Sequence, residues 1–340
     1  MKNKAKILSA IAMNKVAGKK IPLRVILKLT KRCNLRCKHC LEWRFQGPDV
    51  PFEKIKQMLD KLAKAGATHL SINGGEPLIR KDIGEIIRYA KKLGLSIGFT
   101  SNGTFIPHKI NEIKDVDILG LSLDGPKEIH DFLRGDGQYD DVMKALDIAK
   151  KNGIKNIYLN TVLTKNLCKN LDSIDEIVAV AKRNNVDCNF VTMYGDVKDG
   201  IIQKPSDEEL KLALRRIIEL KKMGAPILYS LLNYEYCLKW PDFSKEKYFE
   251  SEKHNIKGPI KCKAGELAIA VEANGDVYPC NMVKNEVQPE NIFSDKSVSE
   301  IMKNVCNKNK CKYCYYGCYV EANALFSLDP KIIREYLKKS

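Results

Sequence analysis

A short loop that carries three cysteines constrains this chain most strongly. Cys33, Cys37 and Cys40 follow directly on an apolar, strand-like run at 23–30. Iron–sulfur clusters are normally held by cysteine thiolates, and a fully ligated [4Fe–4S] cluster takes four of them. A Cys-x3-Cys-x2-Cys loop supplies three, which leaves one iron able to bind a group that is not protein. The loop therefore predicts redox chemistry at an open coordination site.

Composition and cysteine usage favour a cytoplasmic protein. The chain has 340 residues, 44% of them hydrophobic, which is enough for one large domain and a small one. No apolar stretch approaches the ~20 residues of a membrane span, and the N-terminus lacks the features of a signal peptide. Because secretion signals are absent, the 12 cysteines are expected to be reduced thiols. Their clustering near both ends favours metal ligation.

The net charge of +16 has two interpretations. Lysines are scattered over every predicted helix, without an aromatic-interleaved basic tract, so we interpret them as a solvated surface and consider a nucleic-acid partner unlikely. RNA modification remains an alternative that steep salt dependence of RNA binding would support. Residues 1–20 form a basic extension that we predict to be amphipathic. It either contacts an anionic membrane surface peripherally or packs on the rest of the protein.

Strand-like and helix-like segments alternate through residues 21–230. Strands are predicted at 23–30, 69–73, 95–100, 117–123, 156–163 and 187–193, and helices at 51–63, 82–93, 140–152, 171–184 and 207–223. Gly66, Gly94 and Gly153 are helix stop signals. Repeated strand–helix units imply a parallel sheet with right-handed crossovers. Six units are too few for a closed eight-stranded barrel, so we expect an α/β fold, a partial (β/α)6 TIM-like barrel.

Polar segments follow several of these strands directly. Gly74-Gly75-Glu76-Pro77, Ser101-Asn102-Gly103 and Asp124-Gly125 each come after a predicted strand, as the cysteine loop does. The carboxyl ends of parallel barrel strands meet at one mouth, where active sites are built. We therefore expect these segments to converge there.

The pattern changes in residues 231–340, which we predict to be a small cysteine-rich domain. Residues 266–279 have the pattern of a β-hairpin, with Asn274-Gly275 in its tight turn. The segment 320–338 is predicted to contain one or two closing helices.

With the cysteine loop, Gly74–Pro77 and Ser122-Leu-Asp-Gly125 assembled, the chain resembles the radical S-adenosylmethionine (radical SAM) superfamily over residues 20–230. The resemblance implies a [4Fe–4S] cluster on Cys33, Cys37 and Cys40, whose open iron binds S-adenosylmethionine (SAM). Reductive cleavage of SAM then gives a 5′-deoxyadenosyl radical, which takes a hydrogen atom from the substrate.

The resemblance also implies cofactor-binding residues. Gly74 and Gly75 let backbone approach the cofactor, and Glu76 accepts hydrogen bonds from the methionine ammonium group. His39 lies against the adenine, Ser122 contacts the ribose, and Arg134 pairs with the cofactor carboxylate. Two further residues are expected to line the pocket, Ser101 and Asn102. The alternative for His39 is that it is merely an exposed loop residue. The alternative for Arg134 is a surface ion pair.

The C-terminal cysteines resemble the auxiliary-cluster modules called SPASM and twitch. The match consists of Cys262, Cys280, Cys311, Cys314 and Cys318. Because the full seven-cysteine SPASM pattern is absent, the resemblance implies one auxiliary [4Fe–4S] cluster, closer to the twitch form. Cys262, Cys280, Cys311 and Cys314 match the twitch arrangement, with Cys318 or, less strongly, Cys306 as a replacement for one of them. Whether that cluster keeps a free iron stays open, as does the oligomeric state.

The sequence constrains the substrate and the proton acceptor less strongly than the cofactors. Sulfatase-maturing relatives carry an aspartate base where this chain has Asn281, which disfavours formylglycine formation. Asp124, Glu235 and Tyr236 are alternative proton acceptors. We expect a small organic or lipid-like substrate, oxidised at C–H or joined by a C–C bond, with flavodoxin or ferredoxin as reductant. The alternatives are a peptide-modifying maturase and a non-catalytic iron–sulfur electron carrier.

Overall fold

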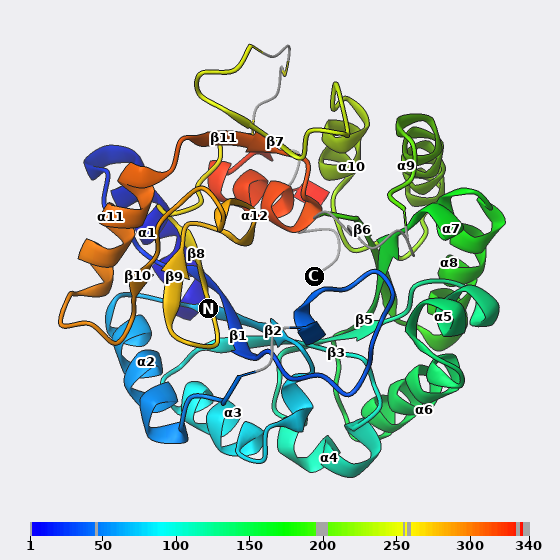
Figure 1. Ribbon diagram of the computed structural model, residues 1–340, viewed down its shortest axis with the longest axis horizontal. Helices are drawn as coiled ribbons and strands as arrows, with labels where there is room; N and C mark the ends of the chain where they lie inside the picture. Colours follow the sequence, from blue (N-terminus) through cyan, green and yellow to red (C-terminus); the bar gives the residue numbers. More distant parts are fainter. Residues whose placement is uncertain are drawn as a thin grey trace.

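The computed structural model describes residues 2–44, 47–194, 203–253, 256, 260–330 and 334–335. Six parallel strands form the wall of a barrel, and most helices form a ring outside it (Figure 1). The barrel strands are β1 (Arg24–Thr30), β2 (His69–Gly74), β3 (Ser96–Ser101), β4 (Ile118–Ser122), β5 (Ile157–Leu163) and β6 (Asp187–Thr192). The associated helices are α2 (Phe52–Lys64), α3 (Ile83–Lys92), α4 (Ile106–Ile113), α5 (Lys127–Arg134), α6 (Gln138–Lys151), α7 (Lys165–Cys168), α8 (Asp172–Asn184) and α9 (Asp207–Lys222).

The remaining elements lie before or after the strand–helix repeat of the barrel, except for two 3-10 turns within it. They are helices α1 (Lys2–Ala17), α10 (Leu231–Leu238), α11 (Val298–Lys308) and α12 (Gly317–Ser327), 3-10 turns η1 (Glu42–Arg44), η2 (Pro77–Ile79) and η3 (Asn281–Val283), and strands β7 (Lys247–Phe249), β8 (Ala268–Val271), β9 (Asp276–Tyr278), β10 (Glu290–Asn291) and β11 (Cys311–Cys314).

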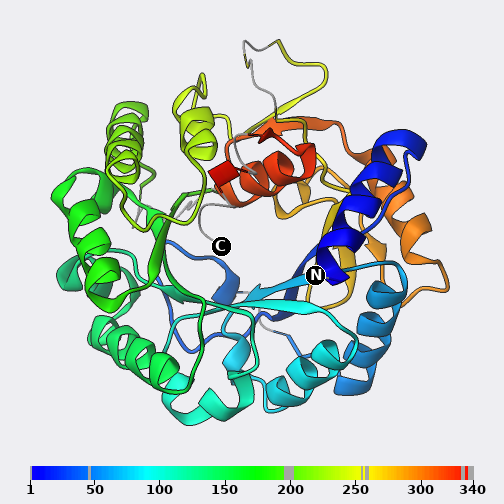
Figure 2. The same cartoon turned by 180° about the vertical axis from the view of Figure 1, so that it is seen from behind.

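The predicted partial barrel is confirmed. The main sheet has the order β10-β9-β8-β1-β2-β3-β4-β5-β6, and β1 to β6 pair in parallel. The ring of strands is open between β6 and the β8 side, where α12 lies inside the ring of helices (Figures 1 and 2). The hairpin β8–β9 extends this sheet, because β8 pairs in parallel with β1. The C-terminal segment therefore continues the barrel wall.

Alternation along the strands separates the hydrophobic core from the barrel interior. On β1, Val25 and Leu27 are fully buried in the core formed with the outer helices. On β2 and β3, Ser71, Asn73 and Thr100 line an interior cavity instead. The apolar core thus lies between the sheet and the helices, and the interior cavity is lined by these polar strand residues together with apolar ones such as Ile26 and Phe326.

Turn glycines behave largely as their sequence positions predict. Gly66, Gly94 and Gly153 end their helices with φ of +97°, +78° and +82°. The hairpin turn is longer than the predicted Asn-Gly pair: Gly275, at φ +88°, donates a hydrogen bond to the Glu272 carbonyl at 2.9 Å, so residues 272–275 form the turn.

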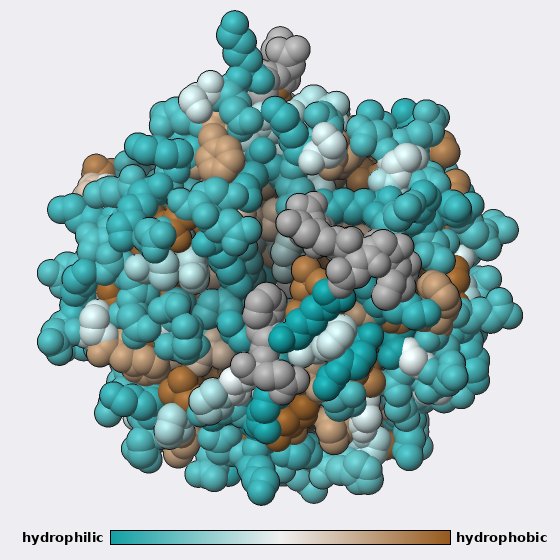
Figure 3. All heavy atoms as spheres, viewed as in Figure 1, coloured by the Kyte–Doolittle hydropathy of each residue, from teal (hydrophilic) through white to brown (hydrophobic). Residues whose placement is uncertain are grey.

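The N-terminal helix α1 packs on the barrel. Ala10 and Ile11 are buried in a cluster with Leu23 and with Phe326 of α12. Leu8 and Val16 of the same helix are exposed, so its apolar residues are not confined to one face. Within the described residues, no helix is both long and apolar enough to cross a membrane. The face seen in Figure 3 is predominantly hydrophilic, in keeping with the scattered lysines.

Candidate active site and auxiliary cysteine cluster

Two glycines fix the root of the cysteine loop. The N–H of Gly75 donates to the Thr30 carbonyl, and the N–H of Glu76 donates to the Arg32 carbonyl, both at 2.9 Å. A Cβ at Gly75 would lie 2.1 Å from the Arg32 oxygen, and one at Gly74 would lie 2.3 Å from the Thr30 oxygen. The end of β2 therefore packs directly on the backbone that leads into the loop, which is a reason for both glycines beyond any approach to a cofactor.

Further contacts hold the loop over the barrel mouth. The Lys38 N–H donates to the Leu133 carbonyl at the end of α5, at 2.9 Å. The Asn102 amide donates to Asn34 Oδ1 at the same distance, which joins the loop to the end of β3. The three cysteines are thus attached to several strand ends at once.

The segments expected at the mouth do converge. A cavity of about 160 Å³ is lined by the three loop cysteines and by all eight predicted cofactor-binding residues, His39, Gly74, Gly75, Glu76, Ser101, Asn102, Ser122 and Arg134. The structure also places there Glu42, Trp43, Asn73 and Thr100. These four were missed from the sequence. Asn73 and Thr100 could have been found, because strand alternation puts them on the inner face just before the polar turns.

Glu76 is buried and held by three donors. Its Oε1 accepts from Leu78 N at 3.1 Å and from Ser101 Oγ at 3.0 Å, and its Oε2 accepts from Asn102 N at 2.8 Å. Burial is the largest influence and raises the pKa of Glu76 to about 7, against these hydrogen bonds, which lower it. The carboxylate is fixed in place but would gain from a cationic partner.

Asp124 and Arg134 form a buried ion pair beside the loop, and the His39 ring lies next to it. Arg134 Nε donates to Asp124 Oδ2 at 2.6 Å, and His39 Nε2 lies 3.4 Å from the same oxygen. Burial opposes the charged form of Asp124, but the charge of Arg134 and the His39 ring outweigh it, and the pKa of Asp124 falls to about 2. Arg134 Nη1 is 3.8 Å from Cys37 Sγ. The guanidinium is therefore oriented toward the cysteines.

The donor set fits an iron–sulfur cluster with an additional polar ligand. All three loop cysteines are free thiols, and burial raises the pKa of Cys37 to about 11, so binding to iron must drive its deprotonation. Within the described residues, no three His, Cys, Asp or Glu side chains are grouped as around a single metal ion. The buried His39 Nδ1 and Asn73 Oδ1 have no hydrogen-bond partner among the described residues, and both residues line the mouth cavity.

Five C-terminal cysteines lie in one apolar cluster. Cys280 and Cys311 are buried in it, Cys262, Cys314 and Cys318 pack against it, and its other members include Ile26 and Tyr319. Cys311 and Cys314 are on β11, which pairs with β7. After burial, the groups that most affect the pKa of the Cys314 thiol are Cys262, Cys311 and Cys280, and each of them raises it. The structure thus places four of the predicted ligands in or against one apolar cluster, near enough to affect the pKa of one another.

The two remaining candidates lie at the edge of this group. Cys318 is at the start of α12 and lines the barrel interior. After burial, the pKa of Cys318 is affected most by Arg24, Tyr316 and backbone groups, although Cys318 in turn raises the pKa of Cys280. Cys306, on α11, lines a separate cavity of about 330 Å³ with Cys262 and Cys311. Cys168, Cys188 and Cys237 are buried within the main apolar core.

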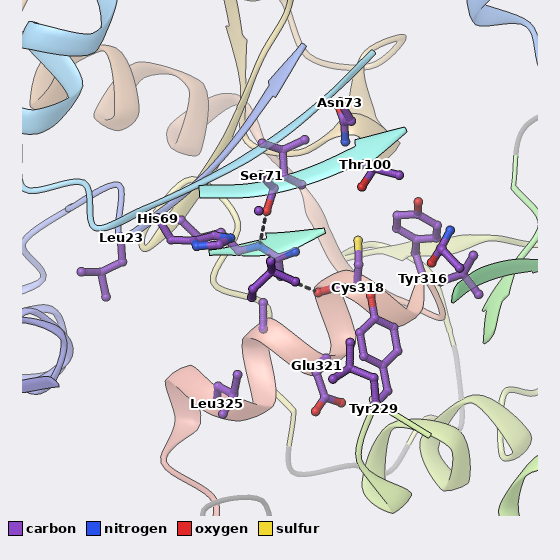
Figure 4. Close-up of a pocket in the computed structure, with 18 of the residues that line it drawn as sticks. Leu23, His69, Ser71, Asn73, Thr100, Tyr229, Tyr316, Cys318, Glu321 and Leu325 are labelled. Atoms are coloured by element: carbon purple, nitrogen blue, oxygen red, sulfur yellow. Dashed lines mark hydrogen bonds between the residues drawn. The ribbon is translucent and has the colours of Figure 1, made fainter. Parts of the chain in front are cut away.

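A larger cavity of about 470 Å³ occupies the barrel interior. It is bounded by the inner faces of the strands and by α12, α1 and Tyr229 (Figure 4). Asn73 and Thr100 line both this cavity and the one at the mouth. A molecule in the interior is therefore adjacent to the cysteine loop. Asn281 lines the interior, whereas Glu235 and Tyr236, on α10, line neither cavity.

Sequence and structure comparisons agree with this geometry. Residues 27–178 match the Radical SAM superfamily. This segment, somewhat less than half of the chain, is a radical SAM domain. Members of that superfamily carry out radical chemistry with a [4Fe–4S] cluster and SAM, and the matched segment begins in β1 and includes the cysteine loop and Gly74–Pro77.

Curated relatives of two kinds are similar to the chain. The Fe-coproporphyrin III synthase of Methanosarcina barkeri is 30% identical over 217 residues, which cover 59% of this chain and 53% of the relative. This chain thus spans about half the length of that protein. The mycofactocin maturase MftC of Mycolicibacterium smegmatis is 25% identical over 306 residues, covering 82% of this chain and 69% of the relative.

A solved structure has the same fold. Streptococcus suis SuiB bound to its precursor peptide SuiA superimposes with a TM-score of 0.66 at 19% identity, covering 86% of this chain and 67% of SuiB. At that identity the likeness concerns the fold.

Proposed function

We propose that Cys33, Cys37 and Cys40 hold the [4Fe–4S] cluster of this enzyme and that the mouth cavity holds SAM. When bound, these cofactors supply a 5′-deoxyadenosyl radical that removes a hydrogen atom from the substrate. The observation that carries the proposal is the convergence of the three thiols and all eight predicted cofactor residues on one cavity.

The mouth residues have complementary roles in this proposal. Glu76 Oε2 accepts one hydrogen bond from the protein, so it retains a lone pair for the methionine ammonium group. Arg134 uses Nε on Asp124, and its remaining N–H groups face the cofactor carboxylate. His39, whose pKa burial lowers, is a neutral ring for the adenine. Ser122 contacts the ribose.

Cys262, Cys280, Cys311 and Cys314 hold the auxiliary [4Fe–4S] cluster in this proposal. Four thiolates would close the cluster, which suits electron transfer rather than ligand binding. Their mutual proximity in an apolar cluster supports the assignment. Cys318 is then a residue of the substrate cavity, and Cys306 lies outside the ligand set.

The substrate reacts in the barrel interior, next to Asn73 and Thr100. The comparisons favour a peptide over the small or lipid-like molecule expected from the sequence, because MftC is a maturase and SuiB is bound to a precursor peptide. In this proposal, one residue or terminus of a peptide enters the 470 Å³ cavity while the rest remains outside.

A small organic substrate is the second candidate. A cavity of 470 Å³ lies within the range that encloses a whole small molecule, and one relative is a synthase of Fe-coproporphyrin III. The wall is largely apolar but includes the polar residues Arg24, Asn160 and Asn281, which suits a substrate with both apolar surface and polar groups.

The test is anaerobic turnover. Protein reconstituted with iron and sulfide is reduced with dithionite and given SAM, and 5′-deoxyadenosine is quantified. Formation of this product supports a radical SAM enzyme, whereas its absence from protein with full iron content would leave the electron-carrier alternative. Candidate peptides and small acids encoded or made by neighbouring genes are then added in deuterated form. Deuterium in 5′-deoxyadenosine identifies both the substrate class and the attacked carbon.

A further inference from the structure

The interior cavity contains an arginine whose charge has no carboxylate partner among the described residues. Arg24, the first residue of β1, donates from Nη1 to the Cys318 carbonyl at 3.1 Å and from Nε to Ser71 Oγ at 3.4 Å. Figure 4 shows the Ser71 hydroxyl and the Cys318 carbonyl at the ends of these two bonds. Both acceptors are neutral, and removing a guanidinium from water without a counter-charge is costly.

The titratable groups around Arg24 do not supply the missing charge. After burial, the titratable groups that most affect the pKa of Arg24 are Cys318, Tyr229, Tyr319 and Tyr158. Burial raises the pKa of Cys318 to about 11 and raises that of Tyr229 well above its ordinary value. The thiol and the phenol are therefore neutral near pH 7.

The remaining charged groups of the wall are also accounted for. Glu321 lines the same cavity, but its carboxylate accepts from Ser230 N, Ser230 Oγ and Asn233 Nδ2, at 2.8–3.2 Å. Burial, followed by the charge of Arg24, lowers the pKa of His69 to about 4, so this ring is neutral. Among the described lining residues, Arg24 is the one cation at neutral pH.

We propose that Arg24 is an anion-binding residue of the barrel interior and that the substrate presents a carboxylate to it. This inference rests on the proposed function, because it names the substrate class of the same cavity. A guanidinium binds a carboxylate through paired, charge-assisted hydrogen bonds. The carboxylate restores the charge balance that the described residues leave incomplete.

The position of Arg24 also restricts where the substrate reacts. Its Nε bonds to Ser71, two residues before Asn73 on β2, and a strand advances roughly 3.3 Å per residue. The bound carboxylate therefore lies roughly 7 Å along the strand from the residue shared with the mouth cavity. We infer that the substrate reacts close to its carboxylate rather than at a distant end.

Two sources of carboxylate are compatible with this geometry, the C-terminus of a peptide and a free small acid. The test measures binding to the full-length reconstituted protein by calorimetry at constant ionic strength. Two acid–amide pairs serve as probes: propionate with propionamide, and acetyl-Gly-Ala with its C-terminal primary amide. Each pair differs in charge and little in shape.

The expected result is at least tenfold tighter binding of an acid than of its amide. R24Q should reduce that ratio to near one, and R24K should retain part of it. K151Q removes one positive charge from an exposed position and should leave the ratio unchanged. Preference for the acid in the peptide pair alone identifies a peptide C-terminus, and preference for propionate alone identifies a small acid.

Equal binding of acid and amide, or no binding of any probe, would overturn the proposal, as would an unchanged ratio in folded R24Q. Iron content and melting temperature establish that the variants are folded. The measurement requires no SAM cleavage, so selective acid binding without 5′-deoxyadenosine formation would reject the proposed function and leave the anion site standing. Normal 5′-deoxyadenosine formation without acid selectivity would reject the anion site and leave the proposed function standing.

Discussion

The two cysteine groups of this protein have similar ligands and different surroundings. Cys33, Cys37 and Cys40 lie on a loop at the barrel mouth beside Glu76 and Arg134. The second group lies in an apolar cluster. A cluster beside charged, hydrogen-bonding side chains can share its open iron with a polar ligand, whereas four thiolates in an apolar setting leave no such position. The number of cysteines and their surroundings together distinguish a catalytic site from an electron-transfer site.

Removing one mouth cysteine should have the largest effect. C37A should lower iron from about eight to about four per chain, since one of two [4Fe–4S] clusters is lost. Its 5′-deoxyadenosine formation should fall below detection, as measured by anaerobic turnover and iron analysis. C168A, at a buried cysteine of α7, is the matched control and should keep both. Turnover by C37A with only four irons would mean that the catalytic cluster lies elsewhere.

Removing an auxiliary cysteine should distinguish the roles of the two clusters. C280A should also lose about four irons, yet retain slow 5′-deoxyadenosine formation, because the mouth cavity is intact. C318A and C306A should keep the full iron content. Iron loss in C318A comparable to that in C280A would place Cys318 among the ligands and contradict the four-cysteine assignment.

The glycine contact at the mouth offers a steric test. G75A places a Cβ 2.1 Å from the Arg32 carbonyl, so the strand end and the cysteine loop must separate. We expect a loss of about 3 kcal/mol in unfolding free energy, the upper part of the range for overpacking, together with weaker cluster retention. Denaturant unfolding of the cluster-free protein measures the first effect. G47A, where nothing lies within 4 Å of the added Cβ, should change neither.

Glu76 should produce a pH dependence of stability. Burial raises its pKa from the ordinary 4.5 to about 7, so between these values the folded state binds a proton that the unfolded state has lost. The unfolding free energy contributed by Glu76 should therefore fall as pH rises from 4.5 to 7, by up to about 1.4 kcal/mol per pH unit, and stay level above 7.

Denaturant titrations of cluster-free protein at several pH values measure this slope. E76Q should lack it, and E53Q, on an exposed part of α2, should keep it. An equal slope in wild-type protein and E76Q would show that the buried carboxylate does not titrate in this range.

Much of the barrel could be predicted because local and global signals agree. The apolar strands, the helix-ending glycines and the polar turns after the strands each determine structure over a few residues. The helix α5 was missed because its eight residues bury only two side chains, although it carries Arg134. That Asp124 binds Arg134 and His39 could not be predicted, since it depends on how the ends of different elements meet.

The interior was also beyond sequence reasoning. Strand alternation places Ser71 and Asn73 inward, but the confinement of Arg24 depends on α12, which is more than 290 residues away in sequence. The continuity of β8 with β1 depends on the same long-range packing. Contacts of this kind leave no local pattern in the chain.

Electron paramagnetic resonance of the reduced protein during a SAM titration tests the central claim most directly. If the mouth cluster is open and the auxiliary cluster is closed, one of two cluster signals should change with SAM. That signal should be the one absent from C37A and present in C280A. A response to SAM by the signal that C280A lacks, or by neither signal, would contradict the account.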